Sequence, residues 1–218
     1  MSLDRAVFAA PATTVAPLLL GAILTVDDVA VRITEVEAYL GIGTDPGSHA
    51  FRREGVKNRT MFGEPGRLYT YLTYGMHVCA NVVCSPRGEA SAVLIRAGEV
   101  VHGVDIARMR RPTSRRDAEL ARGPARLTVA LAIGLADDGA DLGSSRVRLD
   151  LPAVASDHLT GLRTGVSGPG GGADYPWRFW LPDEPSVSPY KAWVPKRRRC
   201  WRAWRTRRWC PAVSSSPI

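Results

Sequence analysis

The stretch VRITEVEAYLG, residues 31–41, has the composition of a buried β-strand but carries two glutamates. Because successive side chains of a strand point to opposite faces, Glu35, Glu37 and Tyr39 share one face with Ile33. Ionised carboxylates are rarely buried unless charged or hydrogen-bonding partners replace their hydration. The stretch therefore predicts a core strand with two acids on one face, and the burial of these acids requires a functional or structural explanation.

The patterns on either side of this strand predict a single α+β domain and not an alternating βαβ sheet. Helical spacing is found at 12–21, 101–111 and 117–135. Gly- and Pro-rich stretches at 41–66 and 165–173 predict long loops, and a loop as long as the first is usually functional or disordered. Strands are expected at 22–26, 30–39, 67–74, 76–83, 90–100, 146–150 and 176–181.

The formal net charge of +8 suggests a polyanionic partner, but the excess is confined to one segment. Residues 191–210 hold nine Lys and Arg residues and no acid, whereas residues 1–190 hold 20 basic and 21 acidic residues. The body of the chain is therefore nearly neutral. Nucleic-acid binding by the body has to be argued from local patches and not from the overall charge.

The C-terminal segment KRRRCWRAWRTRRWCPAVSSSPI, residues 196–218, differs in composition from the rest of the chain. Three interpretations compete: a basic arm that binds phosphates, a Trp- and Arg-rich segment for a membrane surface, or an arbitrary C-terminus created by a reading-frame change. Under all three we expect a folded domain at 1–190 and a disordered tail at 191–218.

The cysteines and the apolar segments argue against a membrane-spanning protein, a secreted protein and a zinc protein. The apolar run at 15–26 is too short to span a bilayer and lacks the basic start of a signal peptide. A reduced, cytoplasmic protein without a metal site is expected. Four cysteines are present without zinc-site spacing or paired histidines: Cys79, Cys84, Cys200 and Cys210.

Three tyrosines follow the basic loop 41–66. Tyr69 and Tyr71 share a strand face, and Tyr74 precedes Gly75, where a turn could direct its ring outward. Tyrosines in strands are often core residues, but aromatic rings also stack on bases and can wedge into a duplex. The sequence leaves both interpretations open for this group.

Three further polar residues stand in places that need an explanation. Arg96 interrupts the apolar strand AVLIRAG and requires an anionic partner, for which Glu37 is the obvious candidate. Asn81 lies within the apolar stretch VCANVV and is either a core amide or a selectivity group. His49, in the loop sequence PGSHAF, is a loop histidine for which solvent exposure is the ordinary interpretation.

Taken together and in order, these motifs resemble the bacterial form of the alkyladenine (3-methyladenine) DNA glycosylase family. The resemblance covers roughly residues 5–190 and is most specific between 33 and 99. It implies a curved, largely antiparallel sheet flanked by helices, as in the C-terminal domain of formyltransferases. The motifs that carry it are EVEAYLG, SHAF, NRTMFGEPGRLYTYLTYGMHVCANVV, AVLIRAGEV, ARGPARLTVALAIG and PWRFW.

The resemblance implies a role for two residues in the chemistry itself. Glu37 matches the general base that activates water for attack on the anomeric carbon of the sugar, and Arg96 matches the arginine that helps to hold this water. Glu35 has no comparable role in the family and is left as a supporting or structural acid. Thr164 stands where the family tends to have Val or Ile and contributes a backbone carbonyl to the water site.

Five residues match the family's base-recognition set. Tyr39, His49 and Tyr71 match the residues that enclose the flipped base. Tyr74 matches the residue that intercalates where the base has left, and Asn81 matches the asparagine that disfavours the 2-amino group of guanine. The segment at 168–173, GPGGGA, falls in the family's closing loop but is unusually rich in glycine.

The function implied is a monofunctional DNA glycosylase that excises alkylated and deaminated purines from double-stranded DNA. No cofactor or metal is needed, and no Schiff-base lysine is expected, since Lys57 is the only lysine before the tail. A cytoplasmic, nucleoid-associated monomer without a membrane partner is expected. Two alternatives remain: a non-catalytic damaged-DNA-binding protein on the same fold and, from fold analogy alone, an RNA-binding domain.

Overall fold

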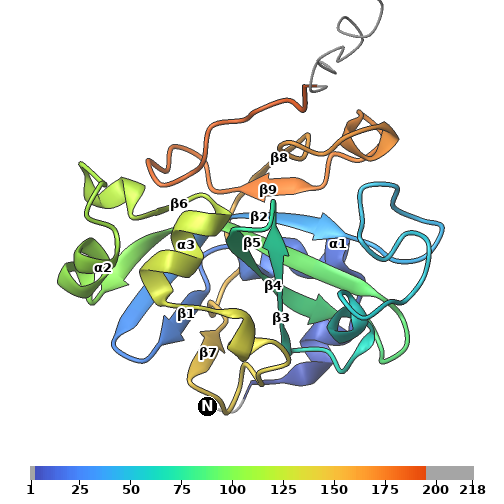
Figure 1. Ribbon diagram of the computed structural model, residues 1–218, viewed down its shortest axis with the longest axis horizontal. Coiled ribbons are helices and arrows are strands. Elements are labelled where there is room, and N and C mark those ends of the chain that lie inside the picture. Colours follow the sequence, from blue (N-terminus) through green and yellow to red (C-terminus); the bar gives the residue numbers. More distant parts are fainter. Residues whose placement is uncertain (1–2, 195–218) are drawn as a thin grey trace, which may run out of the picture.

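Two long antiparallel strands, β2 (Val29–Tyr39) and β5 (Ser91–His102), lie at the centre of the fold. The structure is a computed structural model, and it describes residues 3–194. Both strands are buried along most of their length, because other strands and helices cover both of their faces (Figure 1). Nine of the eleven residues of β2 are buried, and six of these are apolar, so β2 forms a core strand and not a half-exposed one.

The described residues form one sheet of nine strands, in which every pairing is antiparallel. The main path runs β3-β4-β5-β2-β1-β7, while β6 pairs with β5, and β9 pairs with both β2 and β8. The remaining strands are β1 (Ile23–Val26), β3 (Leu68–Thr73), β4 (His77–Cys84), β6 (Ala121–Arg122), β7 (Val147–Asp150), β8 (Leu159–Gly161) and β9 (Arg178–Trp180).

Three short α-helices pack around this sheet: α1 (Ala12–Val15), α2 (Val104–Arg110) and α3 (Pro124–Leu131). The α+β class and the largely antiparallel sheet are confirmed. The helix predicted at 12–21 is present but changes to a 3₁₀ helix at Ala16–Leu19. The helix predicted at 117–135 is present only at Pro124–Leu131. Before it, β6 and Gly123, at φ 119°, interrupt the helical pattern, and after it Ala132, at φ 54°, ends the helix.

Two hydrophobic clusters hold the fold together. The larger one fills the space between the sheet and the helices, and Phe8, Leu24, Ile33 and Leu127 belong to it. The smaller one includes Met61, Phe62 and Tyr69, with Tyr39 and Tyr71 packed against it. Because two of the predicted site tyrosines lie on this second cluster, it forms a rigid support for the site.

The pairing of β2 with β5 is irregular at the glutamates. The register shifts between Ile33 and Glu35 and again between Glu35 and Val36. As a result, Thr34 and Arg96 have no opposite residue in this pairing. Irregularities of this kind redirect side chains and are common next to active sites. Here they place Arg96 of β5 between the two glutamates of β2.

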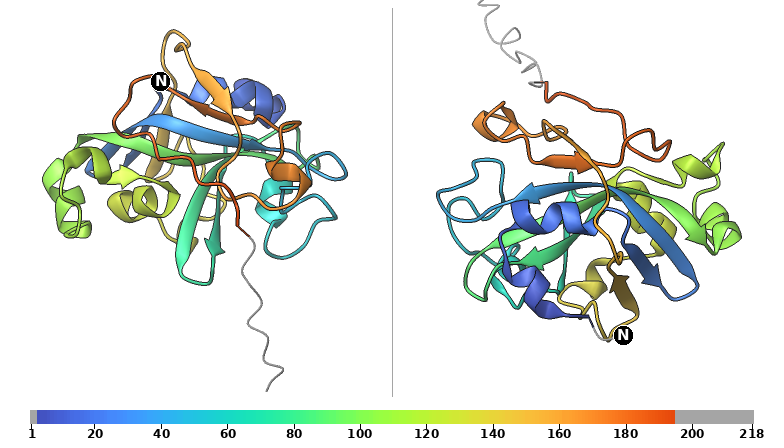
Figure 2. Two further views of the ribbon diagram at one scale, coloured as in Figure 1. Left: turned by 90° about the horizontal axis from the view of Figure 1, so that it is seen from above. Right: turned by 180° about the vertical axis from the view of Figure 1, so that it is seen from behind.

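The β3–β4 hairpin projects from the body of the molecule (Figure 2). Its turn contains Tyr74 at φ 52° and Gly75 at φ 71°. Positive φ at both central residues is typical of the tight hairpin turns that match the twist of the strands. A tyrosine in this conformation is uncommon and is held at the tip, where its side chain is 78% exposed.

The described chain continues past the expected boundary at 190 to Val194. The backbone N–H of Gly165 donates to the carbonyl of Lys191 at 2.8 Å, so Lys191 contacts the body. The rest of the predicted tail, 195–218, lies outside the described residues. Within 3–194, no helix has the length and hydrophobicity of a membrane span.

A glycine next to the strand irregularity offers a test of this arrangement. A Cβ on Gly98 would lie 2.3 Å from Cγ1 of Val31 and 2.5 Å from the backbone oxygen of Arg32. Because backbone cannot move aside easily, Gly98→Ala should lower the free energy of unfolding by about 1–3 kcal/mol. Urea unfolding would measure this, with Gly134→Ala as the control, where a Cβ would meet only the backbone nitrogen of Ala136 at 4.0 Å. Equal stability of the two variants would contradict the close packing of β2 on β5.

A truncation tests the C-terminal boundary. A chain that ends at Val194 keeps the Lys191 contact and removes eight Lys and Arg residues. We expect an unchanged melting temperature, weaker nonspecific DNA binding and a smaller dependence of that binding on salt, because fewer cations contact phosphates. Thermal unfolding and a salt titration of DNA binding would measure both effects. A large loss of stability would show that residues 195–218 belong to the folded domain.

Candidate active site

A cavity of about 520 Å³ lies where β2, β3, β4 and β5 meet the loops at 46–49 and 164–167. Six of the seven residues predicted for the site line it: Tyr39, His49, Tyr71, Tyr74, Asn81 and Arg96. The seventh, Glu37, is completely buried and does not line the cavity. The structure therefore brings all seven residues together, with the carboxylate below the cavity floor.

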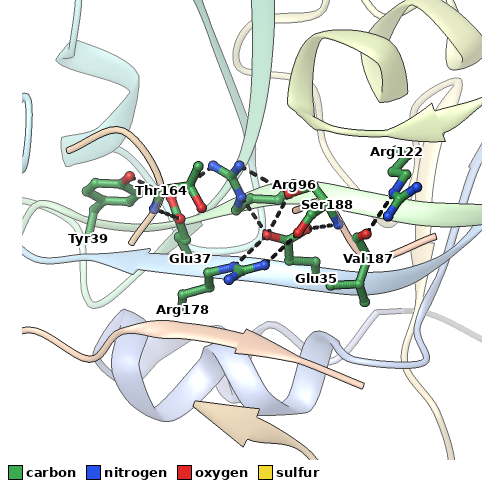
Figure 3. Close-up of polar contacts among 9 residues, drawn as sticks. All are labelled: Glu35, Glu37, Tyr39, Arg96, Arg122, Thr164, Arg178, Val187 and Ser188. Carbon is green, nitrogen blue, oxygen red and sulfur yellow. Dashed lines mark hydrogen bonds and ion pairs between the residues drawn. The ribbon is translucent and has the colours of Figure 1, made fainter. Parts of the chain in front are cut away.

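The Glu37 carboxylate accepts hydrogen bonds from three groups (Figure 3). The backbone N–H of Thr164 donates to Oε1 at 2.6 Å, and the Tyr39 hydroxyl donates to Oε2 at 2.8 Å. Nη1 of Arg96 also contacts Oε2, at 3.2 Å. All three partners are donors, an environment that suits an ionised carboxylate and replaces its lost hydration.

The Arg96 guanidinium uses each of its three nitrogens on a different partner. Nε donates to Glu35 at 2.8 Å, Nη1 donates to Glu37, and Nη2 donates to the Ser188 hydroxyl at 3.3 Å. Burial alone would lower the pKa of Arg96, but the charges of Glu37 and Glu35 raise it above its ordinary value. The arginine is thus a fixed cation, as its place in an apolar strand requires.

Glu35 is also fully buried and accepts four hydrogen bonds. Arg96 and Arg178 donate to Oε1 at 2.8 and 2.7 Å, and Ser188 donates through both its backbone N–H and its hydroxyl. Burial alone would raise the pKa of Glu35, but the two arginines, with Ser188, lower it. The two acids of β2 are therefore buried because two arginines accompany them.

Aromatic side chains form part of the cavity wall. His49 and Tyr71 meet edge to face, with ring centroids 4.5 Å apart. Burial lowers the pKa of His49, which keeps the imidazole neutral at pH 7. Burial also raises the pKa values of Tyr39 and Tyr71, so both phenols keep their protons. A flat, neutral aromatic surface suits a planar, electron-poor ligand.

The side chain of Arg163 is completely buried and lies over the ring of Tyr39. Its guanidinium lies 4.5 Å from the Tyr39 ring centroid, pairs with both oxygens of Asp45 at 2.6 Å and donates to the carbonyls of Ala38 and Gly170. Three separate segments meet at this one cation. The position of the Tyr39 ring is fixed as a consequence.

Asn81 and Tyr74 line the cavity from different parts of the β3–β4 hairpin, Asn81 from β4 and Tyr74 from the turn. Asn81 is 4% exposed, and its amide nitrogen donates to the carbonyl of Tyr69 at 3.0 Å, which orients the side chain. Tyr74 lines the cavity from the hairpin tip and is largely exposed to solvent. Asn81 can therefore act on a ligand inside the cavity, and Tyr74 on what remains outside.

Four residues of this arrangement were missed by the sequence analysis: Arg163, Arg178, Ser188 and Lys191, the last of which also lines the cavity. A detectable signal existed for Arg178, which sits between aromatic residues in PWRFW as Arg96 sits between aliphatic ones. Ser188 and Lys191 carried no such signal. Among residues 3–194, no three His, Cys, Asp or Glu side chains converge as ligands for a metal ion.

Comparison with known proteins identifies the family. The family model described as methylpurine-DNA glycosylase (MPG) matches residues 6–185. A protein of Leifsonia xyli subsp. xyli is 62% identical over 86% of this chain and 92% of its own length. One of Streptomyces avermitilis is 51% identical over 90% and 95%. Both are named, provisionally, as 3-methyladenine DNA glycosylases. The chain therefore belongs to the methylpurine-DNA glycosylase family and is a DNA glycosylase.

Proposed function

We propose that this enzyme hydrolyses the N-glycosidic bond of alkylated purines of the 3-methyladenine type, and of deaminated purines, in duplex DNA. The observation that carries the proposal is the buried Glu37–Arg96 pair directly below an aromatic cavity that is large enough for one base. We assign Glu37 as the general base and Arg96 as the residue that orients the attacking water.

The chemistry follows from the charges at the cavity floor. When the bond between the sugar and the base breaks, its electron pair leaves with the base, and positive charge develops on the sugar. A carboxylate beside the sugar stabilises that charge, as in glycoside hydrolysis. Water then bonds to the anomeric carbon and gives its proton to Glu37. The water must approach where Arg96 and Thr164 meet the carboxylate (Figure 3).

Base selection follows from the cavity wall. A 3-methylated adenine is electron-poor and cationic, so it gains from stacking on Tyr39 and Tyr71, and His49 remains neutral beside it. Base stacking on aromatic side chains contributes about 1–3 kcal/mol per base. Asn81 is held in place by its hydrogen bond to the carbonyl of Tyr69. We propose that it disfavours guanine by clashing with the 2-amino group.

Access to the base requires that it leave the duplex. A base inside the helix cannot reach a buried carboxylate, so we propose that the nucleotide is flipped into the cavity and that Tyr74 fills the gap. A second groove, beside Tyr69 and Tyr71, is lined by Arg52, Arg53 and Lys57, cations that suit the phosphates of the flanking strand.

We expect a monomer acting on chromosomal DNA in the cytoplasm, at the nucleoid.

We also propose that the enzyme has no lyase activity on the abasic product. Lyase chemistry needs an amine that attacks the sugar, whereas the carboxylate and arginine here suit activation of water. Lys191 lines the cavity, but it is exposed, and none of the contacts of Glu37 or Arg96 involves it. Lys57 lies on the separate groove.

The role of Glu37 can be tested by Glu37→Gln. Removal of the Glu37 carboxylate should slow single-turnover release of the purine by about 10²–10⁴-fold. Binding to lesion-containing DNA should be retained. Release from methylated or hypoxanthine-containing duplexes would be followed by alkaline cleavage at the abasic site. Glu89→Gln, on the surface, is the matched control and should behave as wild type. Wild-type release rates in Glu37→Gln would exclude Glu37 as the base.

The absence of lyase activity can be tested by borohydride trapping. Wild-type enzyme incubated with abasic DNA and borohydride should form no covalent complex, because no Schiff base is available for reduction. Lys191→Ala should give the same result. A covalent complex in wild type that disappears in Lys191→Ala would contradict the proposal and identify Lys191 as the amine.

A further inference from the structure

A segment near the end of the described residues contacts Glu35 and its arginine partners. This segment, residues 182–191, is called here the C-terminal strap. At one side, the carbonyl of Val187 accepts a hydrogen bond from Nε of Arg122 at 2.8 Å (Figure 3). At the other side, Lys191 accepts one from Gly165, the neighbour of the residue whose N–H binds Glu37. The strap is thus anchored on both sides of the carboxylates.

Ser188 is the residue of the strap that enters the buried network. Its hydroxyl donates to Oε1 of Glu35 at 2.9 Å and accepts from Nη2 of Arg96 at 3.3 Å. Its backbone N–H donates to Oε2 of Glu35 at 2.7 Å, and its carbonyl accepts from Nη2 of Arg178 at 2.7 Å. Because the hydroxyl donates to one neighbour and accepts from the other, its direction is set.

Glu35 binds the same guanidinium beside Ser188, since its Oε1 also accepts the hydrogen bond of the Ser188 hydroxyl. It engages Nε of Arg96, which leaves Nη1 directed at Glu37. The two carboxylates and the two arginines, Arg96 and Arg178, balance in charge, so no net charge is buried. Removal of a contact from this network would leave the guanidinium free to turn within its plane or to shift toward the other acid.

We infer that Glu35 and Ser188 are positioning residues for the reaction, which hold Arg96 so that its Nη1 edge faces Glu37. The inference rests on the proposed roles of Glu37 and Arg96. It makes the C-terminal strap part of the catalytic apparatus, although Ser188 does not line the cavity proposed to hold the purine. Misplacement of a catalytic group by as little as about 1 Å can cost a large factor in rate, which is why a remote hydroxyl matters.

The strap offers a matched pair of serines for the test. Ser188 and Ser186 are both buried, two residues apart, and each makes a side-chain hydrogen bond to β2. Ser186 binds Thr34 and has no bond to Arg96 or to either glutamate. Both alanine variants therefore remove one buried hydroxyl from the same segment, but only Ser188→Ala removes a contact of Arg96.

The readout separates chemistry from binding and from stability. Ser188→Ala should release base about tenfold more slowly in single turnover, with an unchanged dissociation constant for lesion-containing DNA. Ser186→Ala should release base at the wild-type rate even if its melting temperature falls as far. Glu35→Gln should be slower than Ser188→Ala, because it also removes the charge that engages Nε. If Glu35→Gln does not fold, Ser188→Ala decides alone.

The outcomes distinguish this inference from the proposed function. If wild type is active and Glu37→Gln is not, but Ser188→Ala releases base at full rate, only the positioning role is wrong. Equal slowing by Ser188→Ala and Ser186→Ala would also overturn it, since the strap would then act through stability alone. If wild type releases no base from any lesion, the proposed function fails, and the positioning role fails with it.

Discussion

The pairing of two buried carboxylates on β2 with the guanidinium of Arg96 on β5 is the interaction on which the site depends. Burying either acid alone would be costly, and so would burying the arginine alone. The three groups satisfy one another only because the register of β2 against β5 shifts at this point and leaves Arg96 without an opposite residue. The irregularity and the ion pairs are therefore a single feature of the structure.

The aromatic part of the site depends on a second buried cation. Arg163 joins Asp45, the backbone of β2 and the glycine-rich loop, and it lies against Tyr39, whose hydroxyl donates to Glu37. The aromatic lining of the cavity and the Glu37 carboxylate are thus connected through the Tyr39 side chain. A shift of the loop near Gly170 would be transmitted to both, because Arg163 contacts each segment directly.

The sequence predicted the parts of this arrangement that are local. The strand at 30–39 and the hairpin break at Gly75 follow from alternation and turn chemistry, whereas the seven candidate residues were implied by the resemblance to a known family. The sequence could not predict β6, since a break after two residues depends on Gly123 and on tertiary pairing with β5. It also could not predict Ser188, because an ordinary serine becomes part of the site only through contacts with residues more than 90 positions away.

The position of Ser188 near the end of the described chain affects how the protein is made. Glu35 and Arg96 precede the strap that completes their hydrogen bonds by at least 80 positions, so they are synthesised before it. Until it docks, two acids and their arginines lack the backbone N–H, hydroxyl and carbonyl of Ser188 that complete the buried network. A chain that ended before Ser188 would leave Glu35, Arg96 and Arg178 without these hydrogen bonds, so the buried network can be completed only after most of the domain has been made.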